Sequence, residues 1–495
     1  MILGQGIRSG VQWLFFGNTG GQILQFAFGI VLARVLVPAD FGMVVTMQVF
    51  TGFVGLLASG GMGQSLVRAK EATDEDFRAV FTMQLALGVG IYATFFFSAP
   101  LIARYLENPL YEGLLRVSAL SFLLRPFSNI HLSWLSREML FKKITQVNLM
   151  IGVVTGVASV AMATAGFGVW SLILSGLLGA VAGNVAYALT TPIRLRVRFD
   201  MNRVRAHGGY GLKFTTAEFL KHLREQGINL IISKMAGPAA IGLFSRAESL
   251  ARMAHRMVTP ATSKVVFRAM SKVQDDLDQT KYMFHRMITL LMVYILPFVI
   301  GLGWTAEQLV AILYGEKWLP IVDPMRIIMI GAVFRIVFIA CSLVLQAQDR
   351  LTQEVIAEGV TLVLGLAACV IGLRWGLNGV AWGVVLTSGF FTVYVYVLVH
   401  RILPIRLAEL LKAMEPAYLL NGLLFVTLAA VHFVVGDALR GRPIAYLAIM
   451  VPIGGAVYTT AFLYLPIPEL EAEANRWRQK ARSLLVAAAA FRGRT

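Results

Sequence analysis

The 495-residue sequence is 57% hydrophobic and only 14% charged, and its formal net charge is +17. A typical soluble domain has about 25% charged residues, so this composition excludes an ordinary soluble globular protein. Long apolar runs recur along the chain, and each can cross a hydrocarbon layer of about 30 Å as an α-helix. Backbone groups in lipid must be hydrogen-bonded within the segment, which favours helices over open strands.

About fourteen such runs are predicted to be transmembrane helices. In chain order they cover residues 13–36, 43–66, 79–103, 114–135, 147–165, 168–191, 214–236, 238–262, 284–305, 324–346, 355–374, 378–400, 416–435 and 444–465. The first run is too long for a cleaved signal peptide and lacks a small-residue cleavage site, so we expect it to be retained. The sequence therefore predicts an all-α, multi-pass membrane protein.

Lys and Arg residues concentrate in alternate loops. One set of loops carries Arg68, Lys70 and Arg78; Arg137, Lys142 and Lys143; and Arg194, Arg196, Arg198, Arg203 and Arg205. The opposite set carries few, namely Arg104, Lys317, Arg374, Arg440 and Arg442. Loops rich in Lys and Arg remain in the cytoplasm, so both termini are predicted there. Topology and attraction to anionic membrane lipids thus account for the net charge, and no nucleic-acid partner is expected.

The chain contains an internal repeat. Residues 34–43 (RVLVPADFGM) resemble residues 234–243 (KMAGPAAIGL) at an offset of 234 − 34 = 200, and the basic residue, the Pro-Ala pair and the Gly coincide. Residues 132–137 match 345–350, and 166–170 match 376–382, at slightly larger offsets. Spans 1–6 therefore correspond to spans 7–12. Because six is even, both halves enter the membrane in the same direction and form a parallel repeat about the membrane normal.

The repeat predicts four parts. They are an N-terminal six-helix lobe at 1–200, a C-terminal six-helix lobe at 201–402, two extra transmembrane helices at 403–466 and a basic cytoplasmic tail at 467–495. In the tail, basic residues surround Trp477, namely Arg476, Arg478, Lys480 and Arg482. An amphipathic helix on the membrane surface and a solvated tail are both compatible with this pattern.

Polar residues inside the spans form stripes, which in membrane proteins face other helices or water. In the first span, Asn18, Gln22 and Gln25 share one helical face. The seventh span has a matching face with Glu218, His222, Glu225, Asn229 and Ser233, and the eighth has Glu248, Arg252, His255 and Thr259. We expect these faces to line one cleft between the halves.

The stripes are rich in cations. Spans 7 and 8 contain Lys221, Arg224, Lys234, Arg246, Arg252 and Arg256 against Glu218, Glu225 and Glu248, so their formal charge is 6 − 3 = +3, and Arg125 adds a cation in span 4. A cationic cavity suits an anionic ligand, and arginine matches phosphate with a planar set of donors. The predicted substrate-binding residues are Arg125, Lys221, His222, Arg224, Arg246, Arg252, His255, Arg256, Gln22, Gln25 and Asn229. The structural alternative is that i,i+4 pairs such as Glu248 and Arg252 simply satisfy each other.

Signals for enzymatic chemistry are weak. The sequence has no Walker A, HExxH or GxSxG motif, so neither catalytic residues nor a cofactor is predicted. Cys341 and Cys369 lie inside apolar spans, which favours packing roles over a disulfide or a metal site. Trp318, in an external segment, is expected to anchor at the membrane interface, with contact to sugar as the alternative.

Several segments resemble one known family. Residues 32–42 (LARVLVPADFG), 137–143 (REMLFKK), 166–170 (GFGVW), 245–247 (SRA) and 315–318 (GEKW) are similar, in this order, to bacterial polysaccharide-synthesis transporters. These form the oligosaccharide flippase group of the multidrug/oligosaccharidyl-lipid/polysaccharide exporter superfamily. The resemblance covers roughly residues 7–400.

The resemblance implies a V-shaped pair of six-helix lobes in the bacterial inner membrane. It implies that the protein exports an undecaprenyl-diphosphate-linked oligosaccharide by alternating access, as a step in lipopolysaccharide or exopolysaccharide synthesis. Polysaccharide polymerase or export machinery is the implied protein partner. Relatives often carry an Asp in the seventh span, where residues 227–234 here read GINLIISK. For coupling to Na⁺, H⁺ or the membrane potential, the candidates are therefore Glu218, Glu225 and Glu248. His222 and His255 could carry protons in such coupling, but a passive hydrogen-bonding role is favoured for both.

Two other functions stay open at this point. One is a cation-coupled drug or metabolite antiporter of the same superfamily, although a cationic drug would favour an acidic cleft. The other is a membrane-embedded glycan polymerase or glycosyltransferase, which would need a larger region outside the membrane than the short loop at 306–323.

Overall fold

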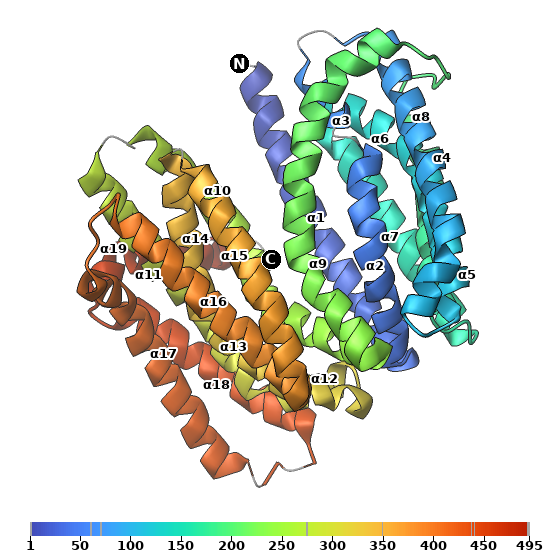
Figure 1. Ribbon diagram of the computed structural model, residues 1–495. Coiled ribbons are helices and arrows are strands. Elements are labelled where there is room, and N and C mark those ends of the chain that lie inside the picture. Colours follow the sequence, from blue (N-terminus) through green and yellow to red (C-terminus); the bar gives the residue numbers. More distant parts are fainter. Residues whose placement is uncertain are drawn as a thin grey trace. The chain divides into compact units, whose positions relative to one another are not determined.

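The computed structural model describes residues 2–59, 62–69, 72–273, 276–348, 350–436, 438–439 and 441–492, and the principal stretches without described side chains are 2–12, 53–59, 201–221, 223–225 and 484–492. Throughout the described part, every regular element is a helix (Figure 1). The chain divides into two compact units, Met1–Ser245 and Arg246–Thr495. The all-α prediction is confirmed, whereas the predicted boundary at residues 200 and 201 stays a prediction.

Unit 1 contains eight helices and most of a ninth. They are α1 (Ile2–Val35), α2 (Pro38–Ser59), α3 (Met62–Arg68), α4 (Asp74–Tyr105), α5 (Leu110–Ala119), α6 (Ser121–Arg137), α7 (Phe141–Thr164), α8 (Trp170–Thr190) and α9 (Met201–Ala251), whose last residues belong to unit 2. The start of α4 follows from its sequence: Thr73 and Asp76 form a capping box that satisfies backbone donors of the first turn. A core of large apolar side chains, including Tyr111, Leu114 and Phe122, holds α4, α5 and α8 together.

Unit 2 contains the remaining helices. They are α10 (Met253–Lys272), α11 (Leu277–Trp304), α12 (Ala306–Leu313), the 3₁₀ helix η1 (Glu316–Ile321), α13 (Val322–Ile330), α14 (Ala332–Ala347), α15 (Leu351–Gly372), η2 (Leu373–Trp375), α16 (Gly376–His400), α17 (Leu407–Val435), α18 (Pro443–Tyr464), η3 (Pro468–Leu470) and α19 (Glu471–Arg492). Where the structure describes them, the predicted spans fall almost entirely on helices. By length and apolarity, eight described helices qualify as membrane spans, or nine when the bent pair Glu316–Ile330 and Ala332–Ala347 is taken as one.

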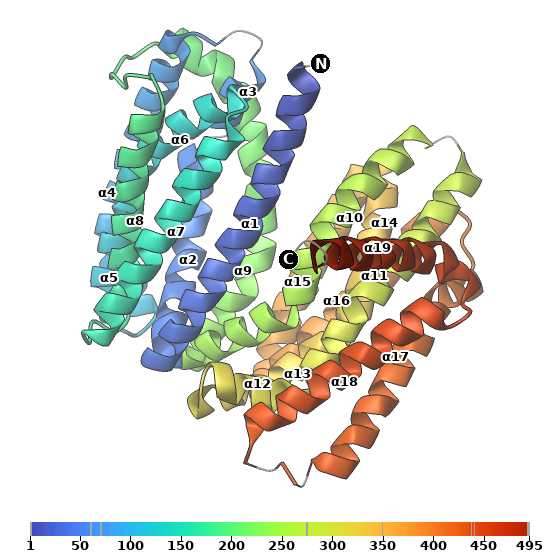
Figure 2. The same ribbon diagram turned by 180° about the vertical axis from the view of Figure 1, so that it is seen from behind.

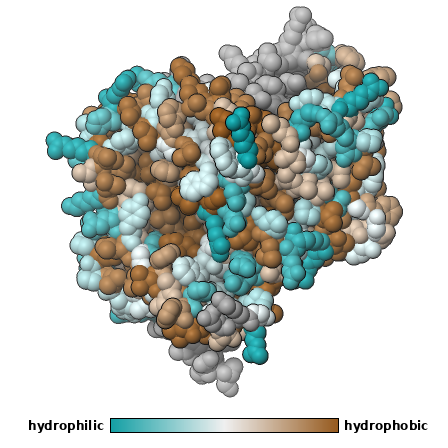
Figure 3. All heavy atoms as spheres, turned by 60° about the horizontal axis from the view of Figure 1, so that its bottom comes forward, coloured by the Kyte–Doolittle hydropathy of each residue, from teal (hydrophilic) through white to brown (hydrophobic). Residues whose placement is uncertain are grey.

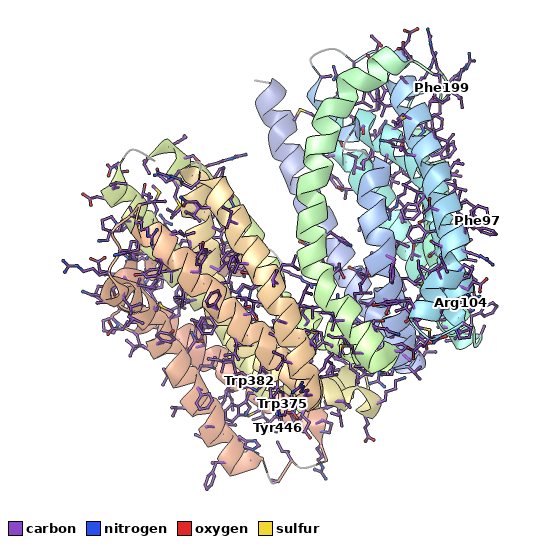
Figure 4. All side chains as sticks on the ribbon, in the orientation of Figure 1. Phe97, Arg104, Phe199, Trp375, Trp382 and Tyr446 are labelled. Atoms are coloured by element: carbon purple, nitrogen blue, oxygen red, sulfur yellow. The ribbon has the colours of Figure 1, made fainter. Side chains whose placement is uncertain are left out.

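The surface has the character expected of a chain in lipid. Large apolar side chains are exposed along the helices; Phe97 of α4, for example, is 76% exposed and points away from unit 1 (Figure 4). Hydrophobic residues cover much of the face seen in Figure 3, with hydrophilic residues in patches between them. Burying such surface is favourable in a bilayer and unfavourable in water.

The two copies of the Pro-Ala-x-x-Gly motif touch each other inside unit 1. A Cβ added to Gly42 would lie 2.9 Å from the amide nitrogen of Gly242, and a Cβ added to Gly242 would lie 3.0 Å from that of Gly42. Each would also collide with the carbonyl group of the other motif's proline, Pro238 or Pro38. Only glycine permits such a close backbone crossing. The motifs matched in sequence are therefore reciprocal partners in space.

Polar contacts reinforce this crossing. The hydroxyl groups of Thr46 on α2 and Ser233 on α9 lie 2.6 Å apart in a buried setting. Beside them, the Lys234 ammonium contacts the carboxylate of Glu107 at 2.6 Å and donates to the carbonyl oxygen of Tyr105 at 2.5 Å. At Gly237, φ is +83°, and this residue interrupts α9. The interruption separates the predicted spans 214–236 and 238–262.

In unit 2, α17 and α18, which follow the predicted repeat, are attached to α11. The Thr289 hydroxyl donates to the carbonyl oxygen of Ala413 on α17 at 2.7 Å. The Tyr458 hydroxyl on α18 donates to the carbonyl oxygen of Val293 at 2.6 Å. At the other end of α11, the Trp304 indole N–H donates to the hydroxyl of Tyr446 at 3.2 Å. Thus α17 and α18 satisfy polar groups along α11.

Candidate functional site

A small cavity in unit 2 brings basic side chains together. Its volume is about 30 Å³, which exceeds the roughly 10–15 Å³ that one water molecule requires. It is lined by Ala251, Arg252, His255, Ile328, Gly331, Ala332, Arg335, Val384, Val385 and Ser388. Two guanidinium groups, one imidazole and one hydroxyl group thus share a pocket whose other walls are apolar.

The cavity lies at two helix breaks. Arg252 occupies the junction between α9 and α10, with φ −95° and ψ 2°. Gly331 occupies the junction between α13 and α14, where the chain bends by 44°. Interrupted membrane helices expose backbone groups that a continuous helix would hide, and transporters commonly build binding sites at such points.

The basic groups also lie deep in the predicted membrane. Arg252, Arg335 and Ser388 fall near the middle of the predicted spans 238–262, 324–346 and 378–400. A charge at this depth is costly without partners. Arg252 has one partner, because its guanidinium contacts the carboxylate of Glu248 at 2.7 Å. The predicted i,i+4 pair therefore forms, and Arg252 still lines the cavity.

His255 is the most deeply buried polar group of the pocket. Its side chain is 4% exposed, and its Nε2 atom has no hydrogen-bond partner among the described residues. A buried imidazole nitrogen of this kind is poised to bond to a molecule inside the cavity, since unsatisfied buried polar atoms are rare. The Ser388 hydroxyl donates to the carbonyl oxygen of Val384 at 2.7 Å and keeps acceptor capacity.

Of the predicted site residues, Arg252 and His255 meet in this cavity and Glu248 joins them through Arg252. Arg246 lies elsewhere in unit 2, with its guanidinium 5.7 Å from the ring centre of Tyr314 and 5.9 Å from that of Trp318. Arg256 is exposed and contacts the Ser249 hydroxyl at 3.5 Å. The two latter arginines thus do not line the pocket.

The predicted residues of unit 1 are dispersed. Gln22 and Gln25 are exposed on α1, and Arg125 is exposed on α6, with its guanidinium 5.1 Å from the ring centre of Phe122. Asn229 is buried and donates to the side chain of Gln226 at 2.8 Å. The His222 ring lies against Gly52 of α2. The side chains of Lys221, Arg224, Glu218 and Glu225 lie outside the described residues.

Arg335 and Ser388 line the cavity and were not predicted as site residues from the sequence. Arg335 is a charged residue within an apolar span, which by itself is a signal for function, but it belongs to none of the polar stripes from which the site was predicted. The interface expectation for Trp318 is wrong: its side chain is fully buried, 0% exposed. Gly315, at φ +92°, turns the chain into η1 and thereby carries Trp318 inward beneath Arg246.

Comparison with known proteins adds to this picture. The family described as "Polysaccharide biosynthesis protein" matches residues 31–323. The chain is 22% identical over 407 residues to lipopolysaccharide biosynthesis protein WzxC of Escherichia coli (strain K12), covering 80% of this chain and 81% of that protein. It is 25% identical over 312 residues to the succinoglycan biosynthesis transport protein ExoT of Rhizobium meliloti (strain 1021), covering 63% of each.

A solved structure shares the fold. The inward closed conformation of the lipid II flippase MurJ superposes with a TM-score of 0.72, covering 92% of this chain and 99% of that one at 14% sequence identity. Similarity at this level of identity concerns the arrangement of helices alone.

Proposed function

The chain belongs to the polysaccharide biosynthesis protein family, and from this premise we propose that it is a flippase for a lipid-linked oligosaccharide. It is a multi-pass membrane transporter of polysaccharide biosynthesis and not an enzyme. In our proposal, the cargo is an oligosaccharide joined to undecaprenyl diphosphate, and it moves from the cytoplasmic to the periplasmic leaflet of a bacterial inner membrane. Both termini remain in the cytoplasm, and alternating access moves the cargo.

The observation that carries this proposal is the mid-span cavity with Arg252, His255 and Arg335. A diphosphate loses strong hydration when it leaves water, and that loss must be replaced by charged donors. Two guanidinium groups supply flat pairs of N–H donors that match phosphate oxygens, and the Nε2 atom of His255, when protonated, adds a third donor. The small volume suits one phosphate group at the mouth of the pocket better than a sugar.

The rest of the cargo requires different surroundings. The sugars are polar and need hydrogen-bonding partners or water around them. The polyprenyl chain is as apolar as lipid tails, so it can remain in the bilayer while the headgroup crosses. The arginines thus bear the electrostatic part of the task.

The test is flipping in proteoliposomes with a defined lipid-linked oligosaccharide. Arg335→Gln removes one guanidinium group from the cavity and leaves the ion pair between Glu248 and Arg252 intact. A charge-assisted hydrogen bond contributes about 1.5–3 kcal/mol, so we expect flipping at limiting substrate to fall at least tenfold. Arg268→Gln, an exposed cation on α10, is the matched control. Wild-type flipping by Arg335→Gln at equal protein level would overturn the diphosphate role.

The alternatives predict different results. A drug antiporter for cations should have acidic rather than basic groups in its cavity, and it should respond to cationic drugs in the same vesicles. A glycan polymerase or glycosyltransferase should form glycosidic bonds in isolated membranes supplied with lipid-linked sugar. Flipping without bond formation and without drug transport supports our proposal.

Energy coupling is a separate part of the proposal. We expect Na⁺, H⁺ or the membrane potential to drive the cycle, with Glu218, Glu225 and Glu248 as candidate coupling residues. Vesicles with one imposed gradient at a time distinguish the three, because only the coupled gradient should accelerate flipping. Joint function with a polysaccharide polymerase or export machinery is testable by co-purification from cells that make the polymer.

A further inference from the structure

The C-terminal helix α19 runs across unit 2 and is fastened to α11 at its beginning. In Figure 2 it crosses the direction of α11. The Trp477 indole N–H donates to the Tyr294 hydroxyl at 2.9 Å, and that hydroxyl donates to the Glu473 carboxylate at 3.0 Å. Arg286 of α11 adds a hydrogen bond to the backbone carbonyl of Glu469 and an ionic contact of 3.9 Å with Glu473. The start of α19 is therefore fixed.

The start of α19 lies near one end of the membrane spans, because Arg286 stands two residues inside the predicted span 284–305. Tyr294 lies near the middle of that span and reaches Trp477 with its hydroxyl. The chain leaves α18 at Tyr464 and begins α19 at Glu471, so α19 starts where a span ends. Nearby, Lys281 near the start of α11 contacts Glu409 near the start of α17 at 2.7 Å. By the distribution of Lys and Arg, this end of the spans is the predicted cytoplasmic one. A helix that leaves a span there and crosses its neighbours lies near the level of the lipid headgroups.

The faces of α19 differ in a way that suits this level. At 100° per residue, Ala474, Trp477 and Ala481 share one apolar face. Ala474 is buried at 3%, Trp477 is 44% exposed and Ala481 is exposed. The apolar face therefore leaves the protein as the helix proceeds, and its outer part has no protein cover among the described residues.

Cations flank this face on both sides. Arg478 and Arg482 follow one edge, and Arg476 and Lys480 follow the other. After Glu473 the described side chains of α19 include no carboxylate. The Lys480 ammonium lies 5.2 Å from the ring centre of Trp477, an arrangement in which the aromatic ring and the cation can sit together at a headgroup layer.

We propose that α19, from Ala474 onward, binds the headgroups of anionic phospholipids in the leaflet next to the start of α11. The exposed part of the apolar face enters the headgroup boundary, and the side chains of Arg478, Lys480 and Arg482 bind lipid phosphates. Arg476 contacts the carboxylate of Glu473 at 3.5 Å. Because Glu473 and Trp477 are bonded to Tyr294, lipid binding by α19 is connected to α11. This inference concerns bulk membrane lipid and stands apart from the cargo proposed above.

The experiment uses the full-length protein in nanodiscs. Ala481→Cys is labelled with an environment-sensitive fluorophore; the native Cys341 and Cys369 are both buried, which favours labelling at position 481. Nanodiscs contain either phosphatidylcholine alone or phosphatidylcholine with increasing phosphatidylglycerol. We expect the emission to shift to the blue as phosphatidylglycerol rises, and we expect added salt to weaken the response.

Two variants test the role of charge. A basic residue near an anionic surface contributes about a fivefold gain in membrane affinity. The combined substitutions Arg478→Gln, Lys480→Gln and Arg482→Gln should therefore abolish the fluorescence shift, or sharply raise the phosphatidylglycerol content at which half of the shift is reached. Removal of an equal number of cations at exposed positions of the predicted opposite side, Arg104→Gln, Arg374→Gln and Arg442→Gln, should leave it unchanged.

Three results would overturn the inference. The first is an equal response in phosphatidylcholine alone, and the second is a wild-type response from the variant with the three substitutions in α19. The third is a response to undecaprenyl diphosphate at levels where phosphatidylglycerol has no effect, which would assign α19 to the cargo. The first two results leave flipping untested, and the third concerns where the cargo binds and not whether it is flipped, so the inference and the proposed function fail independently.

Discussion

The crossing of Gly42 and Gly242 makes a sharp prediction for Gly42→Ala. The new methyl group would lie 2.6 Å from the carbonyl carbon of Pro238 and 2.9 Å from the amide nitrogen of Gly242. The carbonyl oxygen of Pro238 would lie closer still. Favourable contacts between heavy atoms lie near 3.5–4.0 Å, so α2 and α9 would have to separate by about 1.5–2 Å. Both opposing groups are backbone, so no flexible side chain can move aside.

The expected magnitude follows from two opposing effects. Overpacking of a close contact costs about 1–3 kcal/mol, whereas alanine inside a helix is favoured over glycine by about 1 kcal/mol. We therefore expect a net loss of stability of up to about 2 kcal/mol for Gly42→Ala, near the upper value because the opposing groups are backbone. Gly152 on α7 has nothing within 4 Å of an added Cβ, so Gly152→Ala should be neutral or stabilising. The two substitutions should therefore change the free energy of unfolding in opposite directions, or leave it unchanged only for Gly152→Ala.

The assay is the thermal unfolding midpoint of detergent-purified protein, measured for both variants in the same buffer. Gly42→Ala should lower the midpoint relative to wild type and Gly152→Ala should not. The combination of Gly42→Ala with Gly242→Ala should be less damaging than the sum of the two, because either methyl group already separates the same helices. A midpoint for Gly42→Ala equal to that of Gly152→Ala would refute the close crossing.

Three further predictions concern single contacts. The Lys234 ammonium holds the pKa of Glu107 below its ordinary value, first through a hydrogen bond and then through charge. The stabilisation that this pair provides is therefore complete above the ordinary glutamate pKa of about 4.3, and it is lost as the pH falls through the lowered pKa. The thermal midpoints of wild type and Glu107→Gln should accordingly differ at pH 7 and converge in acid. Cys341 and Cys369 are buried, so a maleimide should label them only after unfolding, and rapid labelling of the folded protein would contradict their packing. Tyr458→Phe removes the bond to the carbonyl oxygen of Val293 and should destabilise the protein by about 1 kcal/mol in the same thermal assay, whereas an unchanged midpoint would argue against that bond.

Much of the fold follows from the sequence because membrane helices are dictated by long apolar runs. The motif match between residues 34–43 and 234–243 predicted equivalent places in two halves, and the structure places the two motifs against each other. That contact was not predictable, since a repeat specifies which residues are equivalent and does not specify which of them touch. The break of α9 at Gly237 is likewise consistent with the predicted end of one span and the start of the next.

The site was predicted only in part, for physical reasons. A polar stripe reveals Arg252 and His255. Arg335 comes from the bent pair α13 and α14, whose other residues at the cavity, Ile328 of α13 and Ala332 of α14, are apolar. The cavity also depends on the bend of the chain at Gly331. A single glycine inside an apolar run does not predict that a membrane helix bends there. Trp318 was misassigned because the sequence cannot show that η1 folds inward.

The attachment of α17 and α18 to α11 has a consequence for chimeric proteins. Both helices lie outside the part of the chain that is predicted to be duplicated. The Thr289 hydroxyl and the backbone carbonyl of Val293 nevertheless have their hydrogen-bond partners on them. A hybrid that takes residues 201–402 from one relative and the rest from another would therefore join α11 to foreign partners. The segment that is exchanged between relatives must extend at least to Tyr464. It is therefore longer than the part of the chain that is predicted to be duplicated.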